Sequence, residues 1–313
     1  MALMDVMSPA EFRALTRPSS VWAVWVTAVN VALIAAGFAL PALWHGAWAW
    51  ILGSVLLGGR ALALGILVHD TAHLTMFASR RMNEWMGTWV FGGLPNVAFQ
   101  AYRRGHLAHH RHAGTEADAD LAFVDTYPAS AASLVRKCLR DVSGVNGVKQ
   151  LFYQIKTFKW RAQRPFLAAH ALLLSALWAL GVPQVYACWW LGQIFVFPLV
   201  LRLRVMGEHG GVPDHFDADP RGNTGTTLAG PLARLLVGPN RVNFHLEHHL
   251  AAAVPSYRLP QMHKMLAERG YYAGWNCIMP SYGAVIRRCW ARGATVPALA
   301  AKRRAQGSLS NMQ

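Results

Sequence analysis

The chain has 313 residues, of which 54% are hydrophobic and 14% charged, and its formal net charge is +15 at pH 7. Soluble globular proteins carry about 25% charged residues, so this composition indicates a membrane protein. The basic residues are dispersed among apolar segments, which argues against a nucleic-acid-binding module. This distribution fits contact with anionic lipid head groups instead.

The N-terminal segment and the cysteines predict a cytoplasmic, reducing environment. Residues 1–20 are polar and include Asp5 and Glu11, so they predict a cytoplasmic tail and not a cleavable signal peptide. The four cysteines form no CxxC pair and have no regular spacing. We therefore expect free thiols in a reducing compartment.

Four stretches are long and apolar enough to cross a bilayer, which requires about 20 residues. They lie at residues 21–40, 47–68, 166–182 and 185–205. Short connections, residues 41–46 and 181–184, join them in pairs. The sequence therefore predicts an all-α membrane protein with four transmembrane helices in two hairpins.

The basic residues also predict the orientation in the membrane. Neither short connection contains Lys or Arg, whereas both termini and the central segment are rich in them. By the positive-inside rule, these parts face the cytoplasm of a multi-pass protein in the cell inner membrane. Arg60, which lies inside the second stretch, is expected to pair with a backbone carbonyl or a lipid phosphate.

Two further segments are predicted to lie at the membrane surface. Residues 85–99 are apolar but interrupted by glycines and Pro95, which predicts a re-entrant or interfacial segment. Residues 151–160 alternate basic and aromatic side chains and predict an amphipathic helix on the membrane. Residues 21–270 would form one membrane domain, and residues 271–313 a cytoplasmic C-terminal tail.

Three short windows hold eight of the fourteen histidines. They are His69-Asp-Thr-Ala-His73, His106-Leu-Ala-His109-His110 and His245-Leu-Glu-His248-His249. Within each window the histidines are three or four residues apart, so on a helix they share one face. One such pair often lies on a solvated surface, but three together predict a metal site.

The number of histidines favours two metal ions over one. A structural zinc takes four ligands and a catalytic zinc three. Eight clustered imidazoles exceed that, and His209 in Gly207-Glu-His-Gly-Gly211 is a ninth candidate. Imidazole suits iron, zinc, copper and nickel. We expect a cytoplasmic helical cap that carries a di-metal site, and two irons there would suit the activation of dioxygen.

The three windows resemble the histidine boxes of the integral-membrane fatty acid desaturase family. The stretch NFHLEHHLAAAVPSYRLP (243–260) also resembles the third-box region of that family. The resemblance covers residues 20–270 and includes the order of hairpins and boxes. It implies a non-haem di-iron oxidase that uses O2 and two external electrons to remove two hydrogens from an alkyl chain. Hydroxylases and carotenoid ketolases share the boxes.

The resemblance also implies the roles of particular residues. The iron ligands and catalytic residues would be His69, His73, His106, His109, His110, His245, His248 and His249, with His209 as an additional metal ligand. Asp70, Glu247 and Asn243 lie beside them and could orient imidazole N–H groups. No His-Pro-Gly-Gly haem motif occurs, so electrons would come from a separate carrier such as a ferredoxin, steered by the basic cytoplasmic face.

The remaining histidines and a short acidic run favour structural roles. His45, His170, His215 and His263 have no partner cluster, and His112 extends the second window but is expected only to form hydrogen bonds. Glu116, Asp118 and Asp120 could orient ligands. A short acidic run is more simply a solvated turn.

The expected function is the introduction of a double bond into a fatty acyl or related lipid chain. A hydroxylase or ketolase of a sphingoid, sterol or carotenoid lipid is the alternative within the same family. A membrane zinc metalloprotease would need Glu at the position of Asp70. A metal transporter or metal-binding protein would need ionisable groups in mid-membrane, where only Arg60 lies.

Overall fold

Helices account for almost all regular structure in the computed structural model, which describes residues 1–290. Two strands of two residues each pair in parallel, with Thr226 opposite Ile278. The elements are α1 (Leu3–Val6), α2 (Pro9–Thr16), α3 (Ser20–Leu43), α4 (Ala47–Ala72), α5 (Arg80–Trp85), the π-helix η1 (Met86–Phe91), α6 (Phe99–His112), α7 (Leu121–Val124), α8 (Ala131–Val142), α9 (Val145–Lys156), α10 (Trp160–Ala179), the 3-10 helix η2 (Pro183–Tyr186), α11 (Ala187–Phe195), α12 (Phe197–Val205), the π-helix η3 (Met206–Gly210), α13 (Pro220–Asn223), β1 (Thr226–Thr227), α14 (Pro231–Leu236), the 3-10 helices η4 (Pro239–Arg241) and η5 (Ser256–Arg258) on either side of α15 (His245–Leu250), α16 (Leu259–Glu268), β2 (Ile278–Met279) and α17 (Tyr282–Cys289).

Three helical stretches within residues 1–290 are long and apolar enough to cross a membrane. They are α3, α4 and the continuous stretch Pro183–Gly210, which joins η2, α11, α12 and η3. These correspond to the first, second and fourth predicted spans. The protein is therefore a helical membrane protein.

The predicted third span, residues 166–182, is not among the membrane-length helices. Helix α10 covers most of it, but its first turns contain Arg161 and Arg164, and it ends at Ala179. The apolar part is consequently shorter than a bilayer requires. The prediction of four spans in two hairpins is thus not confirmed.

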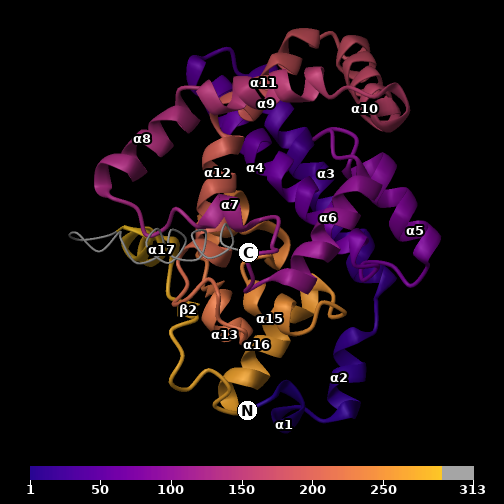
Figure 1. The fold of residues 1–313 in the computed structure, drawn as a ribbon. Coiled ribbons are helices and arrows are strands. Elements are labelled where there is room, and N and C mark those ends of the chain that lie inside the picture. Colours follow the sequence, from indigo (N-terminus) through magenta and orange to yellow (C-terminus); the bar gives the residue numbers. More distant parts are fainter. Residues whose placement is uncertain (291–313) are drawn as a thin grey trace, which may run out of the picture.

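Helix α4 lies at the centre of the apolar helices, where it packs against α3 and α11 (Figure 1). In its most apolar window 72% of the residues are buried, compared with 22% for α3. Glycines permit the close approach. A Cβ on Gly53 would lie 2.6 Å from the carbonyl oxygen of Gly37 on α3, and one on Gly58 would lie 2.8 Å from that of Gly192 on α11.

Arg60 forms two hydrogen bonds within the protein inside the second span, whereas its Nε has no partner among residues 1–290. Its guanidinium donates a 3.0 Å hydrogen bond to Oδ1 of Asn30 on α3 and another to the carbonyl oxygen of Leu235 on α14. The predicted pairing with a backbone carbonyl is confirmed. The buried charge therefore links α4 to two neighbouring helices.

Residues 1–20, predicted as a tail, form α1 and α2 and pack against α16 at the lower end of the molecule in Figure 1. Met7 and Leu15 are 1% exposed and contact a cluster that includes Met262 and Leu266. Part of the predicted C-terminal tail is also packed, because Val285 and Cys289 of α17 are buried. Residues 291–313 of that tail lie outside the described residues, and the domain boundaries stay a prediction.

The surface helix predicted at residues 151–160 has different bounds. Helix α9 begins at Val145 and ends at Lys156, and three residues separate it from α10. Its Phe152, Tyr153 and Ile155 side chains are largely exposed, as expected of an amphipathic helix. The segment predicted as re-entrant contains η1, which packs against α4, followed by turns that lead to α6. Its position relative to a membrane stays a prediction. The four cysteines are free, as predicted.

Candidate metal centre

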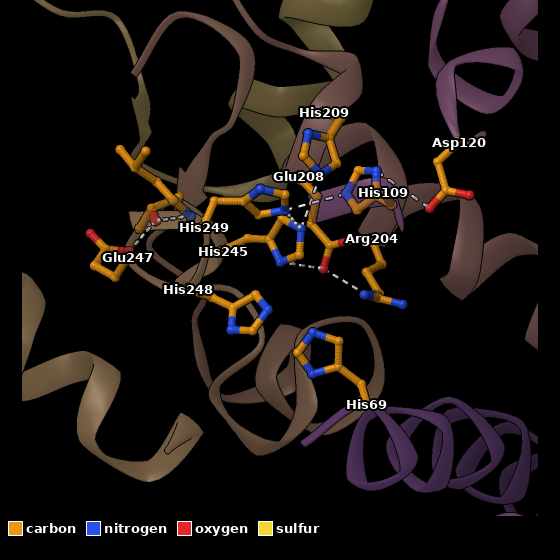
Figure 2. Close-up of polar contacts among 12 residues, drawn as sticks. His69, His109, Asp120, Arg204, Glu208, His209, His245, Glu247, His248 and His249 are labelled. Atoms are coloured by element: carbon orange, nitrogen blue, oxygen red, sulfur yellow. Dashed lines mark hydrogen bonds and ion pairs between the residues drawn. The ribbon is translucent and has the colours of Figure 1, made fainter. Parts of the chain in front are cut away.

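All nine histidines predicted as metal ligands gather in one buried region, and each falls into one of two groups. They come from the end of α4, from α6, from η3 and from α15. Figure 2 shows the rings of His109, His209, His245 and His249 close together, with those of His69 and His248 beside them. Within each group, the candidate ligand nitrogens all lie within 4.8 Å of one another.

The first group contains five histidines. The Nε2 atom of His106 is 2.8 Å from that of His73 and 3.1 Å from that of His110. The Nε2 atoms of His110 and His248 are 2.9 Å apart. His69 completes the group, and its Nε2 is buried without a hydrogen-bond partner.

The second group contains four histidines. The Nε2 atom of His245 lies 3.0 Å from that of His209 and 3.2 Å from that of His249. His109 also belongs to this group, and its Nε2 lies 3.3 Å from that of His249. His209, the candidate outside the three windows, therefore belongs to this group.

Helical geometry divides the second and third windows between the two groups. His106 and His110 are four residues apart on α6 and enter the first group, whereas His109 enters the second. One residue corresponds to a turn of about 100° around a helix, so adjacent histidines face different directions. On α15 the arrangement is reversed, because His245 and His249 belong to the second group and His248 to the first.

Three of the nine imidazoles have their Nδ1 atoms held by oxygen acceptors. His69 Nδ1 is 2.9 Å from Asp70 Oδ1, and His109 Nδ1 is 2.8 Å from Asp118 Oδ1. His209 Nδ1 is 3.1 Å from the carbonyl oxygen of Asn223. A proton held on Nδ1 leaves a lone pair on Nε2, which is the atom that faces the group.

The predicted orienting role is confirmed for Asp70 but wrong for Glu247 and Asn243. The Glu247 carboxylate accepts from the His263 ring and from the hydroxyl groups of Thr226 and Tyr272, none of which belongs to either group. Figure 2 shows Glu247 directed away from the histidines. The Asn243 amide donates to the carbonyl oxygen of Thr227.

The solvated turn predicted for the acidic run is wrong at Asp118. Its side chain is 10% exposed because it reaches inward to His109. Asp120 is half exposed, and its Oδ2 lies 3.8 Å from the same imidazole nitrogen. Glu116 is exposed, as predicted.

A buried ion pair at the end of the third membrane-length helix was not predicted. Arg204 Nε donates a 2.6 Å hydrogen bond to Oε1 of Glu208, four residues later. The same oxygen lies 3.6 Å from Nδ1 of His245 (Figure 2). The signal in the sequence was the pair of opposite charges at i,i+4 inside an apolar stretch.

Two of the other histidines, His170 and His263, have the structural roles predicted for them. His170 bonds with the Tyr186 hydroxyl group and the Leu94 carbonyl oxygen. His263 bonds with Glu247, and His45 is exposed. His112 belongs to neither group.

Burial keeps most of the clustered imidazoles neutral. Burial, together with nearby cationic groups and imidazoles, lowers the pKa of His73 to about 4 and that of His110 to about 3. Burial also lowers the pKa of His248 well below its usual value. For His109, the hydrogen bond and charge of Asp118 outweigh burial and raise the pKa. Neutral imidazoles offer the lone pairs that metal binding needs.

A cavity of about 340 Å³ borders both groups. His106 of the first group and His109, His209 and His245 of the second lie in its wall. The wall is otherwise partly apolar, with Tyr102, Leu121, Phe123, Val124, Leu201 and Val205, and partly polar, with Asp118, Asp120, Arg204, Glu208, His215 and Asn223.

The donor atoms fit transition-metal ions. The two groups consist of imidazoles alone, without thiolate or carboxylate, a donor type that suits iron, zinc and copper. His209 carries its proton on Nδ1, so its Nε2 lone pair faces the Nε2 atom of His245 at 3.0 Å. His109 likewise directs an Nε2 lone pair toward His249. A cation between such lone pairs turns their mutual repulsion into attraction.

Membrane-length helices and two imidazole groups that could hold metal ions together define the class of this protein, and comparison with known sequences specifies the family. The family model of the fatty acid desaturases matches residues 45–281. The chain therefore belongs to the fatty acid desaturase family, and the resemblance predicted from the three histidine windows is confirmed.

Relatives in this family carry out different oxidations. The beta-carotene ketolase of Paracoccus sp. (strain PC1) is 28% identical over 76% of this chain and 93% of its own length. The sphingolipid delta(4)-desaturase/C4-monooxygenase of Bos taurus is 27% identical over 83% of this chain and 78% of its own length. The dihydrorhizobitoxine desaturase of Bradyrhizobium elkanii is 25% identical over 82% and 78%, respectively. These relatives are oxidoreductases, and the chain belongs with lipid oxidoreductases of the membrane.

Proposed function

We propose that this protein is a membrane enzyme that oxidises a lipid chain with O2 and electrons from a separate donor. Its nine clustered histidines would hold two iron ions, five histidines on one ion and four on the other. One observation carries the proposal. Nine imidazoles from distant segments form two adjacent buried groups beside a partly apolar cavity.

Iron fits the two groups better than zinc. Zinc sites in proteins are commonly tetrahedral with four ligands, so five imidazoles in one group exceed what a zinc ion takes up. Iron accepts nitrogen ligands in greater number. When bound, a pair of irons would supply the reductive activation of O2 and the removal of hydrogen from the substrate.

The chain itself positions the ligands and the substrate. Asp70 and Asp118 hold protons on Nδ1 of His69 and His109 and so aim the opposite nitrogens into the groups. Leu121, Val124 and Leu201 give the cavity an apolar wall for a methylene chain. Burial of the site excludes bulk water from it.

We infer double-bond formation in a fatty acyl or related lipid chain as the reaction. Hydroxylation or ketolation is the second candidate, supported by the beta-carotene ketolase that matches over 93% of its own length. The outcome depends on which hydrogen of the chain is held closest to the site after the first is removed.

Two functions from other classes find less support. A zinc protease would need a free general base at position 70, but Asp70 is held by His69 and by the Ser256 hydroxyl group. A transporter would need coordinating groups along its path, whereas the histidine groups lie at the ends of the apolar helices, near Ala72 and Gly210.

The proposal extends to location and partner. The active site would face the cytoplasm, because the histidines share the end of the apolar helices that is rich in Lys and Arg. An acidic electron carrier such as a ferredoxin would dock there. Arg104 and Arg111 of α6 are exposed on the helix that carries the second window, and they would steer such a donor.

Metal analysis and lipid mass spectrometry test the proposal together. We expect two irons per chain in purified protein, and a host lipid that loses two hydrogens on expression, or gains oxygen if the second candidate holds. His106→Ala and His248→Ala should abolish conversion while the protein still inserts. His45→Ala, an exposed histidine outside both groups, is the matched control. One zinc per chain, or full activity in either variant, would refute the proposal.

A further inference from the structure

Two arginines of α12 differ in how many of their guanidinium nitrogens form hydrogen bonds. Arg202 uses all three, because Nε and Nη2 donate to the Asp141 carboxylate and Nη1 donates to the Tyr127 hydroxyl group. Arg204 uses only Nε, which donates to Glu208. Within residues 1–290, Nη1 and Nη2 of Arg204 have no hydrogen-bond acceptor.

The two open nitrogens of Arg204 are reached from the cavity beside the histidine groups. Arg204 lines that cavity, and its side chain is 15% exposed. Among residues 1–290, the unpaired polar atoms that lack accessible surface do not include Nη1 or Nη2 of Arg204. A ligand in the cavity can therefore contact them. Their N–H groups call for an acceptor, because a largely buried donor without one costs free energy.

The guanidinium is also close to the second histidine group. Oε1 of Glu208 accepts from Arg204 Nε at 2.6 Å and lies 3.6 Å from Nδ1 of His245. Figure 2 shows this carboxylate between the guanidinium and the His245 ring. At about 340 Å³, the cavity is at the small end of ligand pockets. A group bound to Arg204 therefore shares a confined space with the histidines of the wall.

The charges of the wall favour a neutral acceptor over an anion. Three carboxyl groups line the cavity, those of Asp118, Asp120 and Glu208. Among the described residues of the wall, Arg204 is the only arginine or lysine, and Glu208 already offsets its charge. An anion in this confined space would be repelled by the carboxylates. The oxygen of a carbonyl or hydroxyl group can accept a charge-assisted hydrogen bond without that repulsion.

We propose that Arg204 is a substrate-binding residue whose Nη atoms donate hydrogen bonds to a neutral oxygen of the lipid, close to the carbon that is oxidised. The substrate is then a lipid with a carbonyl or hydroxyl oxygen near its reaction site. It is neither a plain hydrocarbon chain nor a chain with a carboxylate at that place. This inference rests on the proposed function and narrows its substrate class.

Three matched probes test the inference through binding. They are a long-chain methyl ketone, the alkane of the same length and the fatty acid anion of the same length. We expect purified protein in detergent to bind the ketone about tenfold to hundredfold more tightly than the alkane, which is the contribution of one hydrogen bond to a charged group. The ketone should also bind more tightly than the anion. Isothermal titration calorimetry measures the three affinities.

Variants assign the preference to the guanidinium. Arg204→Lys retains a positive charge for Glu208 but lacks the Nη atoms, so it should lower the ratio of ketone to alkane affinity by about tenfold. Arg204→Met combined with Glu208→Gln leaves neither charge unpaired and should abolish the preference. Arg202→Lys is the matched control, because Arg202 lies on the same helix outside the wall of the cavity, and it should keep the native ratio. Detergent acts on each probe equally in every protein, so a change in the ratio belongs to the side chain.

Several outcomes would overturn the inference. Equal binding of the ketone and the alkane by the native protein would mean that water occupies the place beside Arg204, and this comparison needs no variant. A ratio left unchanged by Arg204→Lys and by the double variant would assign the preference to another residue. Tighter binding of the anion would contradict a neutral substrate. Binding needs neither iron nor turnover, so a ketone preference that depends on Arg204 in a protein without iron or O2-dependent conversion would refute the proposed function alone.

Discussion

At the scale of single residues, the position of one proton decides what an imidazole can bind. The oxygens of Asp70, Asp118 and the Asn223 backbone each hold Nδ1 of one clustered histidine. A carboxylate in this position also makes the opposite nitrogen a stronger donor to a metal. Asp118 therefore supports metal binding by His109 without being a candidate ligand itself.

Replacing Asp118 tests this contribution. Asp118→Asn removes the negative charge beside His109 but retains a hydrogen-bonding side chain. We expect activity or metal affinity to fall by about 10-fold to 100-fold, measured as turnover and as iron retained against a competing chelator. Glu116→Gln, an exposed change in the same loop, should have no effect. Equal behaviour of the two variants would contradict the role assigned to Asp118.

At the scale of elements, the close packing of α4 against its neighbours fixes where the histidine-bearing ends lie. The backbones of α4 and α11 approach each other at Gly58 and Gly192, where no side chain separates them. Because α4 ends next to His73 and the third membrane-length helix ends next to Gly210, this contact sets the distance between parts of the two histidine groups.

Two glycines of the same helix provide a matched test of the packing. A Cβ on Gly58 would lie 2.6 Å from Cβ of Val196, whereas a Cβ on Gly65 meets nothing within 4 Å. We expect Gly58→Ala to lower the free energy of unfolding by about 1–3 kcal/mol. Gly65→Ala should be neutral or stabilising by up to about 1 kcal/mol. Thermal unfolding in detergent compares them, and a stable Gly58→Ala protein would show that α4 and α11 separate easily.

At the scale of the whole molecule, the histidine centre joins distant parts of the chain. Its members come from residues 69 to 249, and they connect the apolar helices to α15 and, through it, to α16 and the N-terminal helices. The free energy of metal binding to such a site contributes to the free energy of folding. Without a metal, the facing Nε2 lone pairs of neutral imidazoles repel one another.

Removal of the metal should therefore destabilise the fold. Ligand binding contributes about 2.7 kcal/mol per site when free metal exceeds the dissociation constant 100-fold. We expect chelation to lower the unfolding temperature and iron to restore it, measured by differential scanning fluorimetry. His45→Ala should respond as the native protein does. If chelated and iron-loaded proteins unfold at the same temperature, the histidine groups do not hold a structural metal pair.

Acidification should weaken the contact between α2 and the residue that follows α16. Arg269 donates hydrogen bonds to both carboxylate oxygens of Glu11. These bonds, together with those from Ser8, lower the pKa of Glu11 from 4.5 to about 2. A depressed carboxyl pKa stabilises the contact above pH 4.5, and the stabilisation is lost as the pH falls toward 2. Hydrogen exchange of α2 should rise over that interval.

A charge-free variant is the control for the pH prediction. Glu11→Gln cannot titrate, so exchange of its α2 amides should not change between pH 4.5 and 2 beyond the intrinsic pH dependence of exchange. A native protein that behaves in the same way would show that the ion pair does not hold α2 in place.

The sequence alone predicted that the clustered histidines would come together, and that they would do so in a helical membrane protein. Hydropathy predicted three of the membrane-length helices, because burial in lipid requires a long apolar run that is local in sequence. The hydropathy prediction failed at residues 166–182, where a helix forms but its apolar part is too short to cross a membrane. Helical spacing predicted eight of the nine histidines, because side chains three or four residues apart share a face whatever the rest of the chain does. His209 came from the family resemblance.

Only the tertiary structure decided how these residues divide and what supports them. The separation of His109 from His106 and His110 into different groups depends on which neighbour each face of α6 meets. Asp118 and Asn223 reach their histidines from loops, and Glu247 turns to His263 instead of the nine. Such contacts depend on tertiary packing between distant segments. Packing of this kind produces no regular spacing in the sequence from which it could be predicted.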